Sequence, residues 1–232
     1  MDGFLNIDKP GGMTSYDVIR FIKRTFRPRC KIGHTGTLDP LAEGVLIVCL
    51  GAATKLSQRV MDCEKEYVAK MVLGTETDTL DTDGKVVRQR QVSATPEEVR
   101  AAVLSFQGEL SQVPPAVSAL KHKGQPLYRH YRRGTVITPQ PRTVFVREIE
   151  VMQICLPAVE FRVVCSRGTY VRALCRDIGE KLGCGAVQAA LRRTRVGPFS
   201  VANSVSLEQL RTDGLTPHLL SVQAVFSLLG ET

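Results

Sequence analysis

Asp39 and His34 are the residues whose types and spacing point most directly to chemistry. Both lie in Gly33-His34-Thr35-Gly36-Thr37-Leu38-Asp39-Pro40-Leu41-Ala42-Glu43-Gly44. A carboxylate can act as a nucleophile or as a base. The glycines allow positive φ or close backbone approach, and Pro40 fixes its own φ while keeping Asp39 out of the α region. We therefore expect Asp39 on a stiff loop; the alternative is an ordinary Asp-Pro turn.

A buried strand and an N-terminal helix are the elements that must position this loop. Val45-Leu46-Ile47-Val48-Cys49-Leu50 follows the loop and is an unbroken apolar run, which indicates a buried strand. Upstream, residues 4–8 alternate as a short strand, and Thr14-Ser15 caps a helix that ends before Pro28. Asp39 is thus expected on a loop leading into a core strand, where functional side chains are often presented.

The rest of the chain predicts an α+β fold with a mostly antiparallel sheet, because hairpin-like strand pairs outnumber strand–helix–strand units. Thr95-Pro96-Glu97-Glu98 is a capping box with proline at the first helical position. The predicted helices lie at about 54–61, 95–108, 169–182, 207–210 and 217–220, with a further short helix that ends at 191. The predicted strands lie at about 65–73, 85–87, 142–154, 158–165 and 192–196.

The acidic segment Gly74–Gly84 superficially resembles a calcium-binding loop. Its register fails, because alignment of its acidic residues puts Thr79 first and Arg90 at the closing ligand position. We interpret it as a tight polar turn between strands. The sequence has no P-loop, no dinucleotide-binding glycine motif and no His-Glu-x-x-His, and its four histidines lack ligand spacing. We therefore do not expect a metal site.

The distribution of charge predicts a polyanionic partner. The net charge is +8, and residues 110–147 contain seven basic side chains and no acidic one. Residues 112–128 are irregular and punctuated by proline and glycine, and the aromatic residues Tyr128 and Tyr131 favour a loop that grips nucleic acid. Arginine at this density suits phosphate. The seven are Lys121, Lys123, Arg129, Arg132, Arg133, Arg142 and Arg147; a second cluster comprises Arg162, Arg167, Arg172, Arg176, Arg192, Arg193 and Arg195.

Composition argues against several other classes of protein. No apolar run approaches the roughly 20 residues that span a bilayer, and residues 1–6 do not begin a secretory signal. Seven widely spaced cysteines without a Cys-x-x-Cys argue against a disulfide framework and a zinc site. We expect a cytoplasmic protein, and a monomer, since no exposed apolar helix requires a partner.

A series of motifs resembles one known family. Residues 33–42 look like the catalytic motif of the TruB family of tRNA pseudouridine synthases, and further motifs follow in the family's order over roughly residues 3–220. The resemblance implies the pseudouridine synthase fold, a mixed and mostly antiparallel sheet flanked by helices and RNA-binding loops, with no cofactor or metal. The further motifs are Asp8–Ser15, Lys65–Ala69, Gly74–Gly84, Gln112–Pro115 with Ser118–Lys121, Cys165–Arg172 and Leu191–Phe199.

The same resemblance implies catalytic roles. Asp39 matches the aspartate that converts uridine to pseudouridine, by attack on ribose C1′ or uracil C6 or by helping to eliminate the base. Tyr67 matches the tyrosine that stacks on the uracil and handles a proton. Arg172 matches the arginine that pairs with the aspartate. The family's usual substrate is the T-loop uridine at tRNA position 55, which must be flipped out of its stack before its glycosidic bond can be reached.

Substrate-binding roles follow in the same way. Tyr170 and Leu191 match pocket residues around the flipped base, and His34 matches the histidine that helps to displace T-loop nucleotides. Lys9 and Lys121 match supporting positions in their motifs. The basic clusters supply a grip on the RNA backbone that does not depend on sequence. The expected partner is therefore tRNA, through its T-stem-loop.

The resemblance also divides the chain. Residues 1–199 match the catalytic domain, and a segment of about 109–134 matches the loop that clamps the tRNA elbow. Bacterial members usually continue into a PUA RNA-binding domain, but only about 33 residues follow Phe199, below the usual size of an independent domain. We expect residues 200–232 to be a short C-terminal extension without a complete PUA domain.

Three positions depart from the family pattern, and two other readings stay open. Val117 and Tyr131 stand in the clamping loop where an aromatic and a small residue are commoner, and Glu43 replaces a small polar residue. One alternative is a catalytically weak tRNA-binding or tRNA-folding module on the same fold. The other is a guide-RNA-dependent relative, a class that relies on a C-terminal RNA-binding domain and partner proteins.

Overall fold

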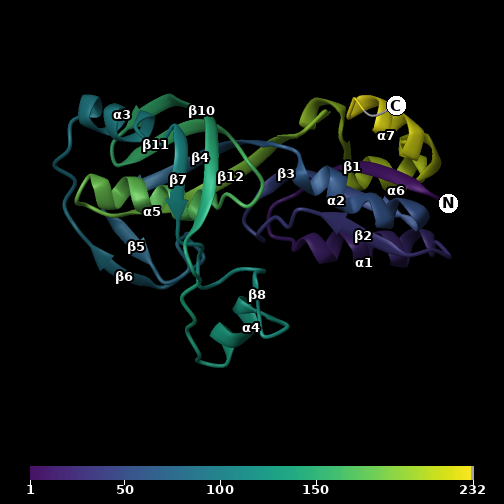
Figure 1. Cartoon of the computed structure of the whole chain (residues 1–232), viewed down its shortest axis with the longest axis horizontal. Coiled ribbons are helices and arrows are strands. Elements are labelled where there is room, and N and C mark those ends of the chain that lie inside the picture. The colour runs from purple at the N-terminus through teal and green to yellow at the C-terminus, as the bar shows by residue number, and fades with distance from the viewer. Residues whose placement is uncertain (231–232) are drawn as a thin grey trace. The chain divides into compact units, whose positions relative to one another are not determined.

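The computed structural model describes residues 1–230, which form two compact units (Figure 1). Unit 1 comprises residues 1–67 and the chain from Arg192 onward, and unit 2 comprises residues 68–191. The chain passes between the units within strands β4 (Lys65–Leu73) and β12 (Ala186–Val196). Both units combine helices with mixed, mostly antiparallel strands, which confirms the α+β prediction.

Unit 1 is built on a sheet whose central strand is β3 (Glu43–Leu50). β3 pairs antiparallel with β1 (Gly3–Lys9) and with β2 (Ile32–Thr35), and its first residues pair parallel with the Arg192-Arg193 end of β12. β14 (Val205–Ser206) extends the sheet parallel to β1. The unbroken apolar run at residues 45–50 is therefore the buried strand that its pattern predicts.

Helices cover both faces of this sheet, which explains why β3 is apolar at every position from residue 45. One cluster packs β3 against α1 (Ser15–Phe26) and α6 (Leu207–Asp213), and the other packs β3 against α2 (Ser57–Asp62) and α7 (Val222–Leu228). Burial of these side chains is the main stabilising term of the unit. The other short elements of unit 1 are η1 (Gly51–Leu56), β13 (Phe199–Ser200), η2 (Val201–Asn203) and η3 (Thr216–His218).

Helix α1 begins and ends where its sequence signals predict. Thr14 is the N-cap, and its hydroxyl and the Asp17 carboxylate form a capping box. At the other end Arg27 is left-handed, with φ of 48°, and its backbone N–H bonds to the Lys23 carbonyl. The helix therefore ends at Phe26, two residues before Pro28.

Unit 2 holds a second group of strands, with two helices packed on them. The order is β12, β4, β11 (Ala158–Cys165), β10 (Arg142–Cys155) and β7 (Gly108–Gln112). Helix α3 (Pro96–Leu104) contacts both β10 and α5 (Val171–Lys181), and the predicted capping box at Thr95 is present. The remaining elements are β5 (Thr75–Thr77), β6 (Val86–Gln89), β8 (Lys121–His122), β9 (Gln125–Pro126) and α4 (Leu127–Arg132).

Two local predictions were wrong. The short helix expected to end at residue 191 is the first half of strand β12, because backbone bonds between Gln188 and both Leu80 and Thr82 hold this segment extended. Long-range pairing thus overrides the helix propensity of its alanines. The segment from residue 112 to 128, expected to be irregular, contains the β8–β9 hairpin and the start of α4.

Two observations bear on the class of protein. No helix within residues 1–230 combines the length and the apolar character needed to cross a bilayer. All seven cysteines are free thiols, and burial raises the pKa of Cys49 to about 12. The buried Cys49 thiol is therefore protonated and behaves as a small apolar side chain.

Replacing Gly44 with alanine tests the close approach of β3 to β12. Gly44 has φ of 96°, and a Cβ there would lie 2.2 Å from the Arg193 carbonyl oxygen. We expect Gly44→Ala to lower the free energy of unfolding by roughly 2–5 kcal/mol, from backbone strain plus overlap. Urea denaturation measures the change.

The matched control is Gly33→Ala. Gly33 has no positive φ and no atom within 4 Å of an added Cβ, so its free energy of unfolding should stay within about 1 kcal/mol of the parent. An equal decrease in both variants would show that the close approach of β3 to β12 is not the cause.

Candidate active site

Asp39 lies on the loop between β2 and β3, as its Asp-Pro context predicts. Gly36 has φ of 68° and makes the turn out of β2, while the Ala42 N–H donates to the Asp39 carbonyl at 3.1 Å just before β3. The Asp39 side chain is half-buried. The carboxylate is therefore carried by a short segment anchored at both ends to the central sheet of unit 1.

The residues on either side of Asp39 are each held by the segment that precedes or begins α1. The Ser15 hydroxyl is buried; it accepts from the Leu38 N–H at 2.8 Å and donates to the Leu38 carbonyl at 3.0 Å. The Gly12 N–H donates to the Pro40 carbonyl at 2.9 Å. The backbone position of Asp39 is thus set by bonds that do not use its own side chain.

Lys9 adds a buried charge to the contacts that hold the Asp39 loop. Its side chain is fully buried, and Nζ donates to the carbonyls of Pro10 at 2.8 Å, Met13 at 2.7 Å and Pro40 at 3.5 Å. Burial lowers the Lys9 pKa to about 8, against the opposing pull of the Glu43 and Asp39 carboxylates. Lys9 thus holds the chain at Pro10 and Met13, and its ammonium lies 3.5 Å from the Pro40 carbonyl oxygen next to Asp39.

Arg193 holds the opposite side of the loop, and sequence reasoning missed it. It is 1% exposed; Nε donates to the Val45 carbonyl at 2.7 Å and Nη2 to the Gly36 carbonyl at 2.9 Å. Its only sequence signal was membership of a basic cluster in the Leu191–Phe199 motif. Its side chain points inward because the parallel pairing of Arg193 with Gly44 sets the register.

His34 lies in strand β2 opposite Val48 and not in an irregular loop, so that part of the loop assignment was wrong. Burial lowers its pKa, and the positive charge of Arg193 lowers it further. Nδ1 is buried and has no hydrogen-bond partner among residues 1–230. His34 is therefore a neutral imidazole near physiological pH.

Tyr67 ends the part of β4 that belongs to unit 1. Its side chain is 9% exposed, and its two preceding neighbours are tied down on either face of the strand. Lys65 Nζ donates to the carbonyls of Met61 and Cys63, and Glu66 accepts from the Thr194 hydroxyl at 2.8 Å. Unit 1 therefore carries four of the predicted site residues: Lys9, His34, Asp39 and Tyr67.

Arg172 is the predicted site residue in unit 2 that connects separate segments of this unit. Its guanidinium is almost fully buried at the start of α5, and Nη1 donates to the Thr79 carbonyl at 2.7 Å and to Asp81 Oδ2 at 3.1 Å. Nη2 donates to the Val117 carbonyl at 3.0 Å. The acidic turn is the polar turn that its pattern predicts, and it also supplies Asp81 as a buried counter-charge.

Tyr170, Leu191 and Lys121 complete this group. The Gln112 side chain accepts from the Tyr170 N–H at 2.8 Å and donates to the Tyr170 carbonyl at 3.2 Å, and the Arg142 guanidinium carbon lies 4.8 Å from the centre of the Tyr170 ring. Leu191 is 8% exposed on β12, whereas Lys121 is exposed on β8. Gln112, a second residue that sequence reasoning did not single out, therefore fixes the backbone of Tyr170.

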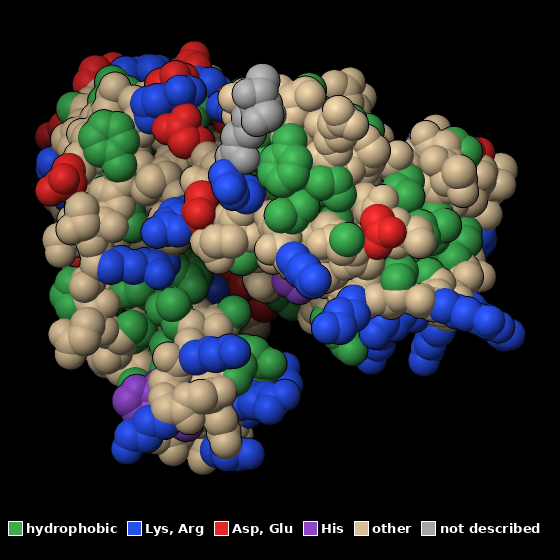
Figure 2. Space-filling model, turned by 45° about the vertical axis from the view of Figure 1, so that its right-hand side comes forward, with side chains coloured by type: hydrophobic (Ala, Val, Ile, Leu, Met, Phe, Trp, Pro, Cys, Tyr) green, Lys and Arg blue, Asp and Glu red, His purple; other side chains and the backbone are tan. Residues whose placement is uncertain are grey.

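We refer to residues 113–141, between β7 and β10, as the clamp segment. Figure 2 shows Lys and Arg side chains spread over it, at the lower left. The Tyr131 hydroxyl donates to Asp78 Oδ2 at 2.5 Å, and this bond lowers the pKa of Asp78 and raises that of Tyr131. The acidic turn thus holds the clamp segment through Asp78 directly and through Asp81 by way of Arg172.

Two family models together match residues 23–217. Residues 23–171 match the N-terminal domain of the TruB family pseudouridylate synthases, and residues 172–217 match the C-terminal domain of tRNA pseudouridylate synthase B. The chain belongs to the TruB family. It is 50% identical over 211 residues to the tRNA pseudouridine synthase B of Alkaliphilus oremlandii (91% of this chain, 70% of the relative), and 45% identical over 228 residues to that of Clostridium tetani (98% and 78%).

Solved structures place this TruB-family chain on the pseudouridine synthase fold. A Cbf5-Nop10-Gar1 complex matches with a TM-score of 0.71 and 36% identity over 90% of this chain, and an H/ACA RNP bound to a substrate RNA containing 2'-deoxyuridine matches with 0.68 and 33%. The chain spans about half the length of these solved chains (54% and 52%). Within residues 1–230 of the TruB-family chain, no group of three His, Cys, Asp or Glu side chains could hold a metal ion.

The buried Lys9 should leave a signature in the pH dependence of stability. Its folded pKa of about 8 lies below the ordinary 10.5, so between these values the unfolded chain holds a proton that the folded chain lacks. The free energy of unfolding then rises with pH in that window. Compared with Lys9→Met, the parent should gain up to about 3 kcal/mol between pH 8 and pH 10.5.

Urea denaturation at a series of pH values measures this gain. The Lys9→Met variant lacks the ammonium donor at every pH, so its curve is offset, but it has no group at this position that titrates. Below pH 8 the two curves should run parallel. If the two curves stay parallel up to pH 10.5, the pKa of Lys9 is not lowered by burial, and the proposed buried charge beside the Asp39 loop is wrong.

Tyr131→Phe tests the bond that holds the clamp segment. Removal of one hydroxyl bonded to a carboxylate should free the segment, and trypsin should cleave after its lysines and arginines roughly tenfold faster. Tyr128→Phe, in the same helix α4, is the matched control, since its ring contacts Arg132 and this contact does not depend on the hydroxyl. Equal cleavage rates for both variants and the parent would show that the Tyr131 hydroxyl does not hold the clamp segment.

Proposed function

We propose that this protein isomerises the uridine at position 55 in the T loop of tRNA to pseudouridine, with Asp39 as the catalytic carboxylate. Its relatives at 45–50% identity are named tRNA pseudouridine synthase B, which supports the reaction class. The assignment of Asp39 rests on the hydrogen bonds that hold the backbone of Leu38 and Pro40, the residues on either side of it. A catalytic group must be held in place by contacts other than its own.

The reaction is an isomerisation that consumes no second substrate. The bond between uracil N1 and ribose C1′ breaks, the detached base turns, C5 bonds to C1′, and the proton on C5 leaves as N1 gains one. Asp39 acts on C1′, on C6, or in the elimination of the base, and each of these routes uses an ionised carboxylate. The nearby Lys9 ammonium favours the charged form of Asp39.

The other site residues have proposed roles around this step. Tyr67 stacks on the flipped uracil and handles a proton, Arg172 pairs with the catalytic carboxylate, and Tyr170 and Leu191 line the pocket. His34 is neutral and half-buried, which suits insertion beside unstacked nucleotide bases. The proposed partner of this surface is the T-stem-loop of tRNA, gripped by the basic clamp segment that includes Lys121.

We further propose that the enzyme acts as a cytoplasmic monomer without cofactor or metal. Seven free thiols support a reducing compartment. The proposed catalytic domain comprises residues 1–199. The alternative of a catalytically weak tRNA-binding module is not favoured, because the relatives are named for catalysis.

Asp39→Asn should abolish the product and leave the fold and RNA binding intact. The amide keeps the shape of the side chain but carries no charge, and removal of an essential catalytic group typically lowers the rate by about 10⁴-fold or more. The assay is incubation with a T-stem-loop RNA and chemical mapping of pseudouridine. Full activity of Asp39→Asn would end the assignment.

The control variant is Asp213→Asn, which makes the same chemical change at a surface carboxylate whose partner is His218 at 3.0 Å. It should retain parent activity. The stem-loop assay also separates the guide-RNA-dependent alternative, because that class needs a guide and partner proteins. Product from the bare stem-loop excludes it, whereas product only with added guide RNA would favour it.

A further inference from the structure

A basic surface on α1 is not used by the site described above. Residues 16–31 contain six basic side chains and a single acidic one, Asp17. All six are exposed, and Figure 2 shows Lys and Arg side chains projecting along the lower right, on the side where Figure 1 draws α1. We call them the α1 basic surface: Arg20, Lys23, Arg24, Arg27, Arg29 and Lys31.

This surface is not neutralised by the protein. Arg20 pairs with Asp17, three residues before it, but the other five members form no ion pair with a carboxylate within residues 1–230. Four of the cations are spaced three or four residues apart along the helix, where like charges repel. A solvated helix face normally mixes both signs, so the uniform charge costs stability.

Arg27 carries a second cost. It occupies the left-handed C-cap position with φ of 48°, where glycine is the usual residue because a side chain adds strain. The helix dipole favours cations such as Lys23 and Arg24 in the last turn. The dipole gives no comparable stabilisation to Arg29 and Lys31, which lie beyond the helix. The charge is therefore kept against local stability.

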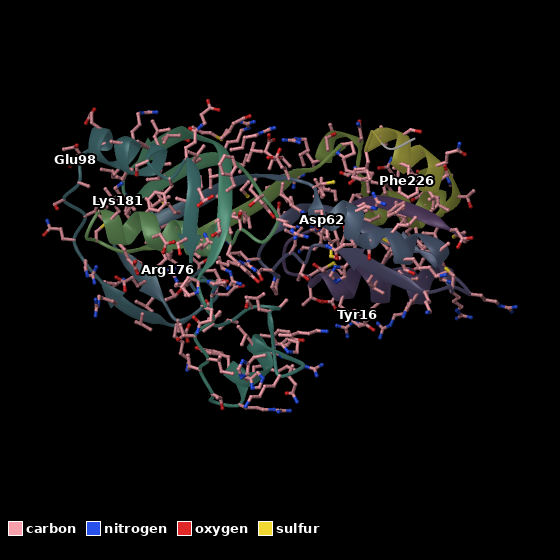
Figure 3. The ribbon with its side chains drawn as sticks, in the orientation of Figure 1. Tyr16, Asp62, Glu98, Arg176, Lys181 and Phe226 are labelled. Atoms are coloured by element: carbon pink, nitrogen blue, oxygen red, sulfur yellow. The ribbon has the colours of Figure 1, made fainter. Side chains whose placement is uncertain are left out.

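The partner chemistry follows from what surrounds these cations. Arginine binds phosphate through a planar fork, and Tyr16, labelled in Figure 3, is 57% exposed beside Arg20, with 5.7 Å between the guanidinium carbon and the ring centre. The apolar face of α1 is buried in the core through Val18 and Ile22. No apolar face remains to enter a lipid layer, as surface-binding helices require. RNA backbone therefore fits better than a membrane.

We propose that the α1 basic surface binds the phosphate backbone of the tRNA substrate outside its T arm. This rests on the proposed function, and it adds a second contact region to the clamp segment. The helix also holds the catalytic loop, since Ser15 in its first turn bonds both backbone groups of Leu38. Phosphates bound on α1 are thus positioned by the same rigid element that positions Asp39.

The test compares two substrates with one triple variant. In Lys23→Gln/Arg24→Gln/Arg27→Gln, KM for full-length tRNA should rise about 10- to 100-fold with kcat unchanged, while KM for the isolated T-stem-loop changes less than about twofold. The salt slope of log affinity for tRNA should fall by about 2 to 3, because each substituted side chain no longer neutralises a phosphate.

The matched control is Lys70→Gln/Arg88→Gln/Arg100→Gln, which removes the same charge from exposed positions elsewhere. It should leave both KM values near those of the parent. If both triple variants weaken RNA binding equally, only net charge matters. If the first triple variant weakens binding of both RNAs equally, the α1 basic surface binds the T arm. Either result overturns the proposal, as does no effect at all.

Arg27→Gly separates binding from folding. Glycine relieves the left-handed strain, so the variant should unfold at the same or higher urea concentration while its affinity for full-length tRNA falls several-fold. Retained affinity would overturn the role of Arg27. If the parent protein forms no pseudouridine in either RNA, the proposed function itself is refuted. If the parent protein co-sediments with anionic phospholipid vesicles and the triple variant does not, a membrane partner is favoured over RNA.

Discussion

A buried ammonium group is the constraint on which the catalytic loop depends. Moving a lysine charge out of water is costly unless it is hydrogen-bonded, and Lys9 meets this demand with the carbonyls of Pro10, Met13 and Pro40. The chain before α1 must therefore fold back around Nζ, which brings Gly12 and Ser15 against the Asp39 loop. These bonds hold the backbone on either side of Asp39 and do not involve its carboxylate.

Unit 2 uses a guanidinium in the same way. Arg172 joins the acidic turn, through Thr79 and Asp81, to the clamp segment, through Val117. A planar group with five donors can bind several acceptors at once, which a single ammonium on a flexible stem does less well. The acidic turn therefore has a structural purpose: it supplies the counter-charge for Arg172 and the acceptor for Tyr131.

Helix α1 combines three tasks along one element. Its apolar face packs on the sheet, its first turn holds Leu38, and its outer face and C-terminal end carry the α1 basic surface. The first two tasks make the helix rigid, and rigidity suits a surface that positions a polyanion relative to a catalytic group. This contrasts with the clamp segment, which depends on a few polar bonds such as that between Tyr131 and Asp78.

Local patterns alone determined much of this protein. The capping boxes at Thr14 and Thr95, the buried strand at 45–50 and the placement of Asp39 on a loop are confirmed, because each depends on residues near one another in the chain. The tertiary structure decided what lies far apart: Arg172 meets Asp81 across 91 positions, Arg193 meets Gly36 across 157, and residues 186–191 become a strand by pairing. Sequence spacing cannot report such contacts, since burial and register are set only when the sheet assembles.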